Sequence, residues 1–95
     1  MTVKIIIDRK IRKGREAEFF DLLKDLRSKA ISSRGYISGE TLRALSDRHN
    51  YVVVSTWQSA EDWKNWEKNP ERRKIQAKTE KLMVRPTRTK LYVHA

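Results

Sequence analysis

Two segments of this chain carry apolar side chains at consecutive positions over about the length of one strand. One is Val3–Asp8 (VKIIID) and the other is Tyr51–Trp57 (YVVVSTW). Successive side chains of a strand point to opposite faces of its sheet, so such runs predict strands that are buried on both sides. A fold that contains both segments therefore needs cover on both faces of its sheet.

The stretch after the first strand changes from a polar connection to helical spacing. We expect Arg9–Gly14 to be the connection and a helix to begin near Arg15. Acidic residues come early in this helix and basic residues late, as the helix dipole favours, and the segment that ends in Gly35 stops it. Apolar residues at the spacing of one helical face predict its buried side, namely Phe19, Leu22, Leu23, Leu26 and Ala30.

Polar turn residues and a proline separate the remaining predicted strands. A strand over Tyr36–Leu45 is followed by a turn over Ser46–Asn50, so it forms a hairpin with Tyr51–Trp57. Arg85-Pro86 ends the helical region that comes next. The alternating stretch Thr87–Val93 (TRTKLYV) then predicts a last strand.

Two N-cap signals lie in the second helical region. Ser59 with Asp62 is a variant of the capping box. Asn69-Pro70 places a capping side chain before a proline at the first helical position, so a new or kinked helix begins there. The buried sides of the two parts are expected to hold Trp63 and Trp66, and then Ile75, Thr79 and Leu82.

The order strand, helix, strand, strand, helix, strand predicts an α+β fold of the ferredoxin-like βαββαβ type, with an antiparallel four-stranded sheet. Residues 1–95 are expected to form a single domain, because this length leaves no room for a second one. The helices of such a fold cover one face only. A second copy of the chain is the simplest cover for the other apolar face, so we expect a homodimer. The chain has no cysteine, so no disulfide stabilises it.

The chain is strongly basic, with 22 Lys and Arg against 12 Asp and Glu and a formal charge of +10. Such a balance suits an anionic partner. The basic residues are spread along the chain, however, without an RRM strand pattern, a GXXG loop or zinc-finger spacing, which argues against a dedicated nucleic-acid role. No apolar run is long enough for a signal peptide or a membrane span, so a cytoplasmic location is expected.

Several stretches resemble the antibiotic biosynthesis monooxygenase (ABM) family. Tyr51–Trp66 (YVVVSTWQSAEDWKNW) is similar to its signature, and Lys13–Phe19 (KGREAEF) to the start of its first helix. Gly35-Tyr36-Ile37 followed by Leu42-Arg43 is similar to its second strand. The resemblance implies a dimeric α+β barrel in which two protomers pack sheet to sheet, each with a pocket between its sheet and its helices. It also implies one of several activities, among them cofactor-independent oxygenation of electron-rich aromatic molecules and haem degradation.

The haem-degrading branch of the family is tested by three positions. Its pattern has an asparagine near the end of the first strand, where this chain has Asp8, and a tryptophan that Trp66 matches. Gln76 stands where the axial histidine would be, and neither His49 nor His94 falls at that position. Glutamine is a poor iron ligand beside imidazole, so the resemblance argues against haem. No cofactor is expected.

Few residues are candidates for chemistry. Trp57 and Trp63 are expected in the core, whereas Trp66 matches a pocket position of the family and is expected to bind substrate. Asp8 is a candidate base, with a solvent-facing carboxylate paired to an arginine as the alternative. The last candidates, Arg73 and Gln76, lie three apart on one side of a helix, where they either orient an anionic substrate or belong to a solvated face.

Three functions remain open at this point. The first is a small oxygenase without metal or flavin that acts on an aromatic or quinol-type metabolite, because such a reaction needs only binding, desolvation and stabilisation of an anion. The second is a non-catalytic dimer that binds a small ligand or only associates. The third is an anion- or nucleic-acid-binding dimer that uses the basic surface.

Overall fold

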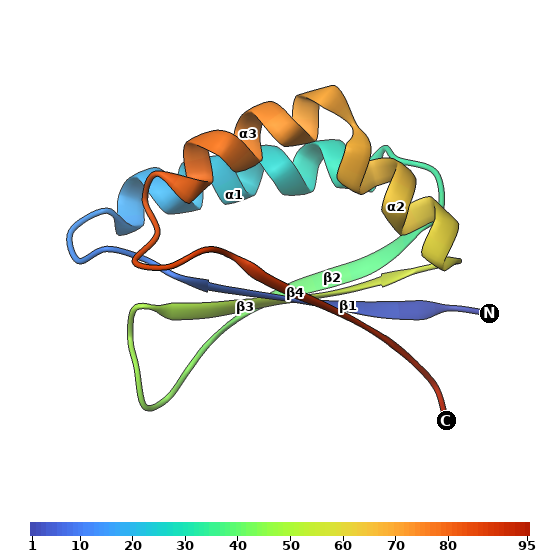
Figure 1. The fold of residues 1–95 in the computed structure, drawn as a ribbon, viewed down its shortest axis with the longest axis horizontal. Coiled ribbons are helices and arrows are strands. Elements are labelled where there is room, and N and C mark those ends of the chain that lie inside the picture. The colour runs from blue at the N-terminus through green and yellow to red at the C-terminus, as the bar shows by residue number, and fades with distance from the viewer.

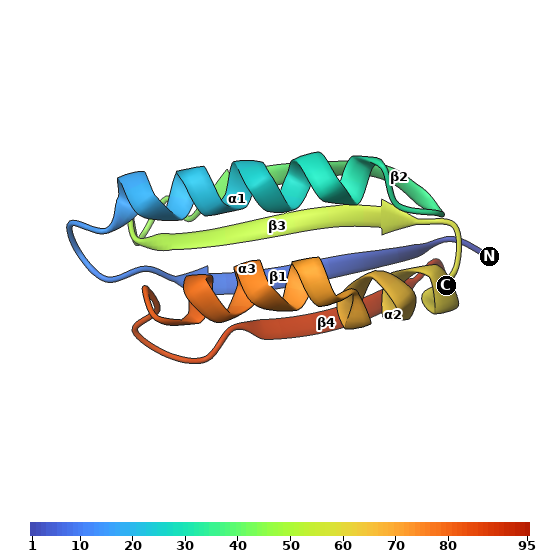
Figure 2. The ribbon, with the colours of Figure 1, turned by 90° about the horizontal axis from the view of Figure 1, so that it is seen from above.

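The structure, a computed structural model, describes all 95 residues and has the predicted ferredoxin-like fold. Its elements are β1 (Val3–Lys10), α1 (Glu16–Ile31), β2 (Tyr36–Arg43), β3 (Asn50–Trp57), α2 (Ala60–Lys68), α3 (Pro70–Glu80) and β4 (Arg88–Val93). The strands form one antiparallel sheet in the order β2-β3-β1-β4. All the helices lie on one face of this sheet (Figure 1). Seen from above, α1 runs along β2 and β3, and α2 and α3 follow each other along β1 and β4 (Figure 2).

Two side-chain caps divide the second helical region as predicted. The Ser59 hydroxyl accepts a hydrogen bond from the Asp62 backbone N–H at 3.1 Å and begins α2. The Asn69 side chain accepts from the backbone N–H groups of Glu71 and Arg72, at 2.8 and 3.3 Å, and begins α3. Because Asn69 itself has extended backbone angles, φ −57° and ψ 128°, the chain changes direction between the two helices.

The turn between α1 and β2 depends on a glycine. Gly35 has φ +86°, a conformation that side chains with a Cβ rarely adopt. Its carbonyl accepts a hydrogen bond from the Gln58 N–H at 2.8 Å, which joins this turn to the end of β3. A Cβ at this position would overlap the Asp62 side chain of α2. The turn thereby fixes where α2 begins relative to β2.

The first strand is longer than the sequence reading gave. Arg9–Gly14 was expected to be a polar connection, but Arg9 and Lys10 continue β1 and pair with Tyr51 and Asn50 of β3. The expectation is wrong because the alternation of β1 continues through these polar residues, which stay paired with β3. Arg9 follows Ile7 on the helix-facing side of the sheet and is 2% exposed.

The core between the sheet and the helices has two parts. One lies under α2 and the start of α3 and contains all the tryptophans; the other joins Phe19 of α1 to Tyr51, with ring centroids 5.3 Å apart. Ile75, Thr79 and Leu82 are buried, as the sequence predicted. Both parts are on the same side of the sheet, so the core ends at the plane of the strands.

The opposite face of the sheet carries apolar residues that no helix covers. Ile6, Val52 and Val54 are half-buried there, and Leu42 is 48% exposed. The strand alternation places these side chains away from the helices, and the pairing register makes them neighbours. The prediction that β1 and β3 are apolar on both faces is thus confirmed. Pairing with a second copy stays a prediction.

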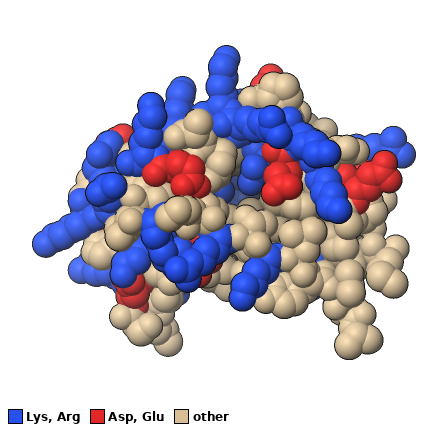
Figure 3. Space-filling model, viewed as in Figure 1, with Lys and Arg blue, Asp and Glu red and all other residues tan.

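Lys and Arg dominate the surface over the helical layer, with few acidic side chains among them (Figure 3). The ion pair of Lys29 with Asp25 on α1, at 2.6 Å, is exposed, and exposed pairs contribute little to stability. No helix combines the length and the apolar composition that crossing a membrane requires.

Candidate functional site

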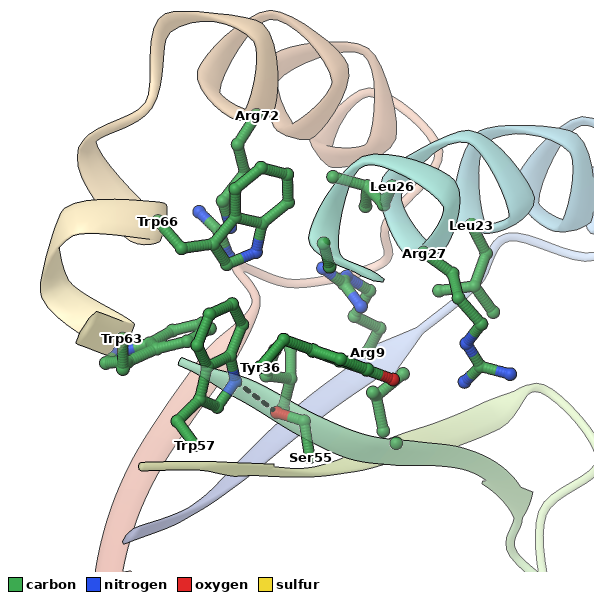
Figure 4. A pocket seen from close by; sticks show the side chains of 14 residues that line it. Arg9, Leu23, Leu26, Arg27, Tyr36, Ser55, Trp57, Trp63, Trp66 and Arg72 are labelled. Carbon is green, nitrogen blue, oxygen red and sulfur yellow. Dashed lines mark hydrogen bonds between the residues drawn. The ribbon is translucent and has the colours of Figure 1, made fainter. Parts of the chain in front are cut away.

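A pocket of about 50 Å³ lies between the sheet and the helices. Side chains from six elements form its wall (Figure 4), and they are Ile7, Arg9, Leu23, Leu26, Arg27, Ala30, Tyr36, Gly39, Val53, Ser55, Trp57, Trp63, Trp66 and Arg72. Its volume corresponds to about four water molecules, which is less than one aromatic ring occupies. The half-buried part of the wall comes from α1, β2 and β3, so the pocket meets solvent on that side.

Four aromatic side chains form one end of the pocket. Trp57 stacks on Trp66 with ring centroids 6.4 Å apart and an interplanar angle of 21°. Trp63 and Tyr36 each meet Trp57 edge to face, at 5.8 and 5.4 Å. The Trp57 indole N–H donates to the Ser55 hydroxyl at 3.1 Å, which fixes the ring that the others contact. The result is a rigid, flat, apolar wall suited to a planar ligand.

A buried arginine faces this wall from β1. The Arg9 guanidinium donates to the Gln76 side-chain oxygen at 2.7 Å, but its Nε–H is buried and has no partner. The pKa of Arg9 is lowered to about 10, chiefly by burial and also by the charge of Arg72, while the charge of Glu80 partly opposes the shift. Even so, Arg9 is protonated at neutral pH, so the pocket holds a desolvated positive charge.

Two further arginines line the pocket. Arg72 of α3 is 7% exposed and lies over the Trp63 ring, with its guanidinium carbon 5.2 Å from the ring centroid. Burial also lowers the pKa of Arg72, and the charge of Glu67 partly opposes this shift. Arg27 of α1 is half-buried and donates to the Thr41 hydroxyl at 2.9 Å. None of the three takes part in an ion pair.

The wall contains no carboxylate and no histidine. The only hydroxyls in it belong to Tyr36 and Ser55. No group of three or more His, Cys, Asp or Glu side chains has the geometry to hold a metal ion. What the pocket offers chemically is therefore an apolar, aromatic surface together with fixed cations.

Of the residues that the sequence suggested for the site, the structure brings only Trp66 to the pocket wall. Asp8 does not line it, because the side chain shares the uncovered face of the sheet with Ile6. It accepts hydrogen bonds there from Asn50 at 2.6 Å and Arg85 at 3.1 Å. Desolvation raises the pKa of Asp8, but these hydrogen bonds and the nearby arginine charges outweigh it, so the pKa is lowered. This arrangement is the paired carboxylate of the alternative reading.

The other two candidates lie on α3 outside the pocket wall. Arg73 is exposed. Gln76 is half-buried and donates to Glu80 and Thr87, at 2.7 and 3.1 Å, while it accepts from Arg9. The side chain at the position of the family's axial histidine thus holds the buried arginine in place.

The sequence reading missed Arg9 and Arg72 as site residues. Both positions carried a usable signal. Arg9 continues the alternation of Val3, Ile5 and Ile7 on the inner face of β1, and Arg72 lies three residues before the buried Ile75 on α3. At both positions the strand or helix spacing predicts a buried apolar residue, so an arginine there signals a buried cation.

The fold compares closely with that of known proteins. A conserved protein from Methanosarcina mazei Go1 superposes with a TM-score of 0.91 at 13% identity, over 97% of this chain and 91% of the other. Rv0793 from Mycobacterium tuberculosis gives 0.90 at 15% identity, over 100% and 96%. SnoaB, a cofactor-independent oxygenase from Streptomyces nogalater, gives 0.88 at 15% identity, over 99% and 93%. At these identities the likeness shows the shared fold.

The sequence itself gives the family. No curated protein matches the chain significantly. The model of the antibiotic biosynthesis monooxygenase family, by contrast, matches residues 2–78, which include every residue of the pocket wall. This chain therefore belongs to the antibiotic biosynthesis monooxygenase family.

Proposed function

We propose that this protein is a cofactor-independent monooxygenase that oxidises a small, electron-rich aromatic molecule of the quinol type. The observation that carries the proposal is a pocket that joins an aromatic wall to the buried, partly unpartnered cation Arg9. Membership of the ABM family supports it, as does the fold shared with SnoaB, which is described as a cofactor-independent oxygenase. Trp66 is proposed to contact the substrate ring, with Gln76 as the residue that positions Arg9.

The proposed reaction requires few functional groups from the protein. A phenol or quinol releases its O–H proton to solvent, and an electron-rich ring carbon of the resulting phenolate adds to O₂ and, after taking up a proton, carries a hydroperoxide. Loss of water from this peroxide leaves a quinone, so that one ring C–H, one O–H and O₂ become two C=O groups and H₂O. Since the wall has no carboxylate or histidine, its contribution is to stabilise the anion electrostatically and to exclude water. Buried cations serve this purpose because they lower the pKa of a bound acid.

Oxygen uptake tests the proposal directly. The protein is mixed with a panel of hydroquinones and anthrones, and O₂ consumption and product mass are followed with the chelator EDTA present. We expect uptake above the autoxidation rate, with one oxygen atom in the product, and its loss in Arg9→Met. A rate equal to autoxidation for every compound would contradict an oxygenase. Ligand binding without oxygen uptake would favour the non-catalytic binding dimer.

We also propose that the protein works as a homodimer that pairs through the uncovered face of the sheet. The half-exposed apolar side chains at the centre of that face, Ile6, Val52 and Val54, support this. A face of this kind is ordinarily buried against a partner. The edges of the same face carry opposite charges, with Glu40 at the β2 edge and Lys90 at the β4 edge, which gives the proposal a specific geometry.

A further inference from the structure

We infer that the pocket recognises its ligand as an anion: a single-ring aromatic acid or phenol whose charged oxygen is held by Arg9 and Arg72 while its ring lies against the tryptophan wall. The inference deepens the proposed function and rests on it only in treating this pocket as the site. It names the charge and the size of the ligand. Its test is binding, which is independent of oxygen chemistry.

Arg9 is a buried cation with an unsatisfied hydrogen-bond donor. The side chain is 2% exposed, it has one hydrogen-bond acceptor, and its Nε–H is buried without a partner. No carboxylate forms an ion pair with it, and the charge of Glu80 offsets only part of the effect of burial. A buried cation that is incompletely compensated is unfavourable for folding. The only hydrogen-bond partner of its guanidinium, Gln76, is neutral. An anion in the pocket would supply the missing acceptor and a direct counter-charge.

Arg72 is a second buried cation in the pocket. It lines the same pocket from the opposite layer, and its charge opposes that of Arg9 strongly enough to lower the Arg9 pKa. Two cations without carboxylates in the wall raise each other's free energy, unless a negative group lies between them. Arginine in pairs is also suited to carboxylate and phenolate oxygens, because each guanidinium presents several N–H donors in one plane.

The remainder of the wall sets the chemistry of the ligand beyond its charge. Nine of its 14 residues are hydrophobic, and the stacked Trp57 and Trp66 present flat surfaces. An inorganic anion would gain nothing from these rings, whereas an aromatic anion contacts both parts of the site. Because the volume of about 50 Å³ is less than one ring occupies, a single ring would extend into the open side of the pocket, and a fused system would extend further into solvent.

Matched pairs of probes separate charge from shape. Benzoate is compared with benzamide, and 4-nitrophenolate with 4-nitroanisole, by calorimetry and by quenching of tryptophan fluorescence in a buffer free of phosphate and sulfate. We expect each anion to bind about tenfold or more tightly than its neutral partner, since a charge-assisted pair replaces a neutral hydrogen bond. Binding should also lower the apparent pKa of 4-nitrophenol, which its visible absorption reports.

Variants assign the effect to residues. Arg9→Met and Arg72→Met, each similar in length to arginine but uncharged, are expected to reduce benzoate affinity about tenfold and to leave benzamide affinity unchanged. Arg72→Met provides an independent test if Arg9→Met folds poorly. Lys74→Met is the matched control, because Lys74 is an exposed cation on the same helix as Arg72. It should bind benzoate like the wild type.

Three outcomes would overturn the inference. They are equal affinity for benzoate and benzamide, no binding of either anion, and displacement of benzoate by inorganic phosphate at equal concentration, which would describe a general anion site. Anion binding with no oxygen uptake from any substrate would remove the proposed oxygenase and leave the inference standing. Oxygen uptake with equal binding of anion and neutral analogue would remove the inference and leave the proposed oxygenase standing.

Discussion

At the scale of single residues, Arg9 stands out because the stability of the chain would be better served by an apolar side chain. Val3, Ile5 and Ile7 precede it on the inner face of β1, and all are buried among hydrophobic neighbours. A charged residue at the next inward position opposes the pattern that builds the core. Local departures of this kind are expected at functional sites, where binding rather than folding determines the residue.

Replacing Arg9 with methionine should therefore stabilise the protein. The lowered pKa, about 10 against 12.5, corresponds to about 3 kcal/mol, and the hydrogen bond to Gln76 that is lost offsets about 1 kcal/mol. We expect Arg9→Met to raise the free energy of unfolding by about 1–2 kcal/mol at pH 7, as measured by urea denaturation.

The pH dependence of the increase in unfolding free energy shows whether the charge of Arg9 causes it. Since the Arg9 pKa is lowered in the folded state, the unfavourable charge is fully present below about pH 10 and is relieved as the pH rises from there toward 12.5. The difference between Arg9→Met and wild type should stay constant from pH 6 to pH 9 and shrink above. A clear loss of stability at pH 7 would show that Arg9 is a structural residue.

Two glycines allow backbone strain and steric overlap to be measured separately. Gly35 and Gly14 have nearly the same φ, +86° and +83°, but a Cβ at Gly35 would overlap Asp62, whereas nothing lies within 4 Å at Gly14. Gly14→Ala should cost about 1 kcal/mol of stability from strain alone. Gly35→Ala should cost at least about 1 kcal/mol more in thermal or urea unfolding. Equal losses would mean that the turn yields without disturbing α2.

At the scale of elements, the sequence predicted most of the fold because local signals and tertiary packing agree. Ser59 and Asn69 cap α2 and α3 where their sequence pattern places them, and the buried side of α3 is the predicted one. The end of β1 was misread, since polarity suggested a loop where the ladder to β3 keeps the strand extended. Pairing between distant strands is not visible in either segment alone.

The pocket was less predictable than the elements that form it. Trp66 was found through its family position, but Arg9, Arg27 and Arg72 come from three different elements and meet only when the helices lie on the sheet. In a chain with 22 basic residues, three inward-facing arginines have no compositional signature. Asp8 was a candidate for the site, but it is next to Ile7, which faces the helices. Because side chains alternate along a strand, Asp8 points to the uncovered face instead.

The cap at Asn69 is expected to link the stability of α3 to the position of Arg72. Its side-chain oxygen accepts from the Arg72 backbone N–H at the first turn of the helix. Asn69→Ala should destabilise the protein by about 1 kcal/mol, measured by urea unfolding, and reduce benzoate affinity in parallel. Asn69→Asp keeps the acceptor and complements the helix dipole, so it should behave like the wild type. An unchanged stability in Asn69→Ala would show that Pro70 alone begins the helix.

At the scale of the whole molecule, the uncovered face of the sheet carries an ordered row of charges and apolar residues. The pairing register aligns Glu40, Val54, Ile6 and Lys90 across the four strands. The row is therefore acidic at the β2 edge, apolar in the middle and basic at the β4 edge. A second copy rotated about an axis parallel to the strands places the acidic edge of one chain over the basic edge of the other, and the two apolar centres then meet.

Charge reversal tests this geometry. Wild type is expected at twice the chain mass of 11.3 kDa in light scattering after size exclusion. Glu40→Lys and Lys90→Glu should each weaken the dimer on the order of tenfold, because every reversal acts at two symmetric sites. The double variant restores opposite charges and should recover most of the affinity. Glu61→Lys, an exposed reversal on α2, is the control and should stay dimeric. A monomer at every concentration would refute the homodimer, whereas a double variant weaker than both single ones would refute only the orientation.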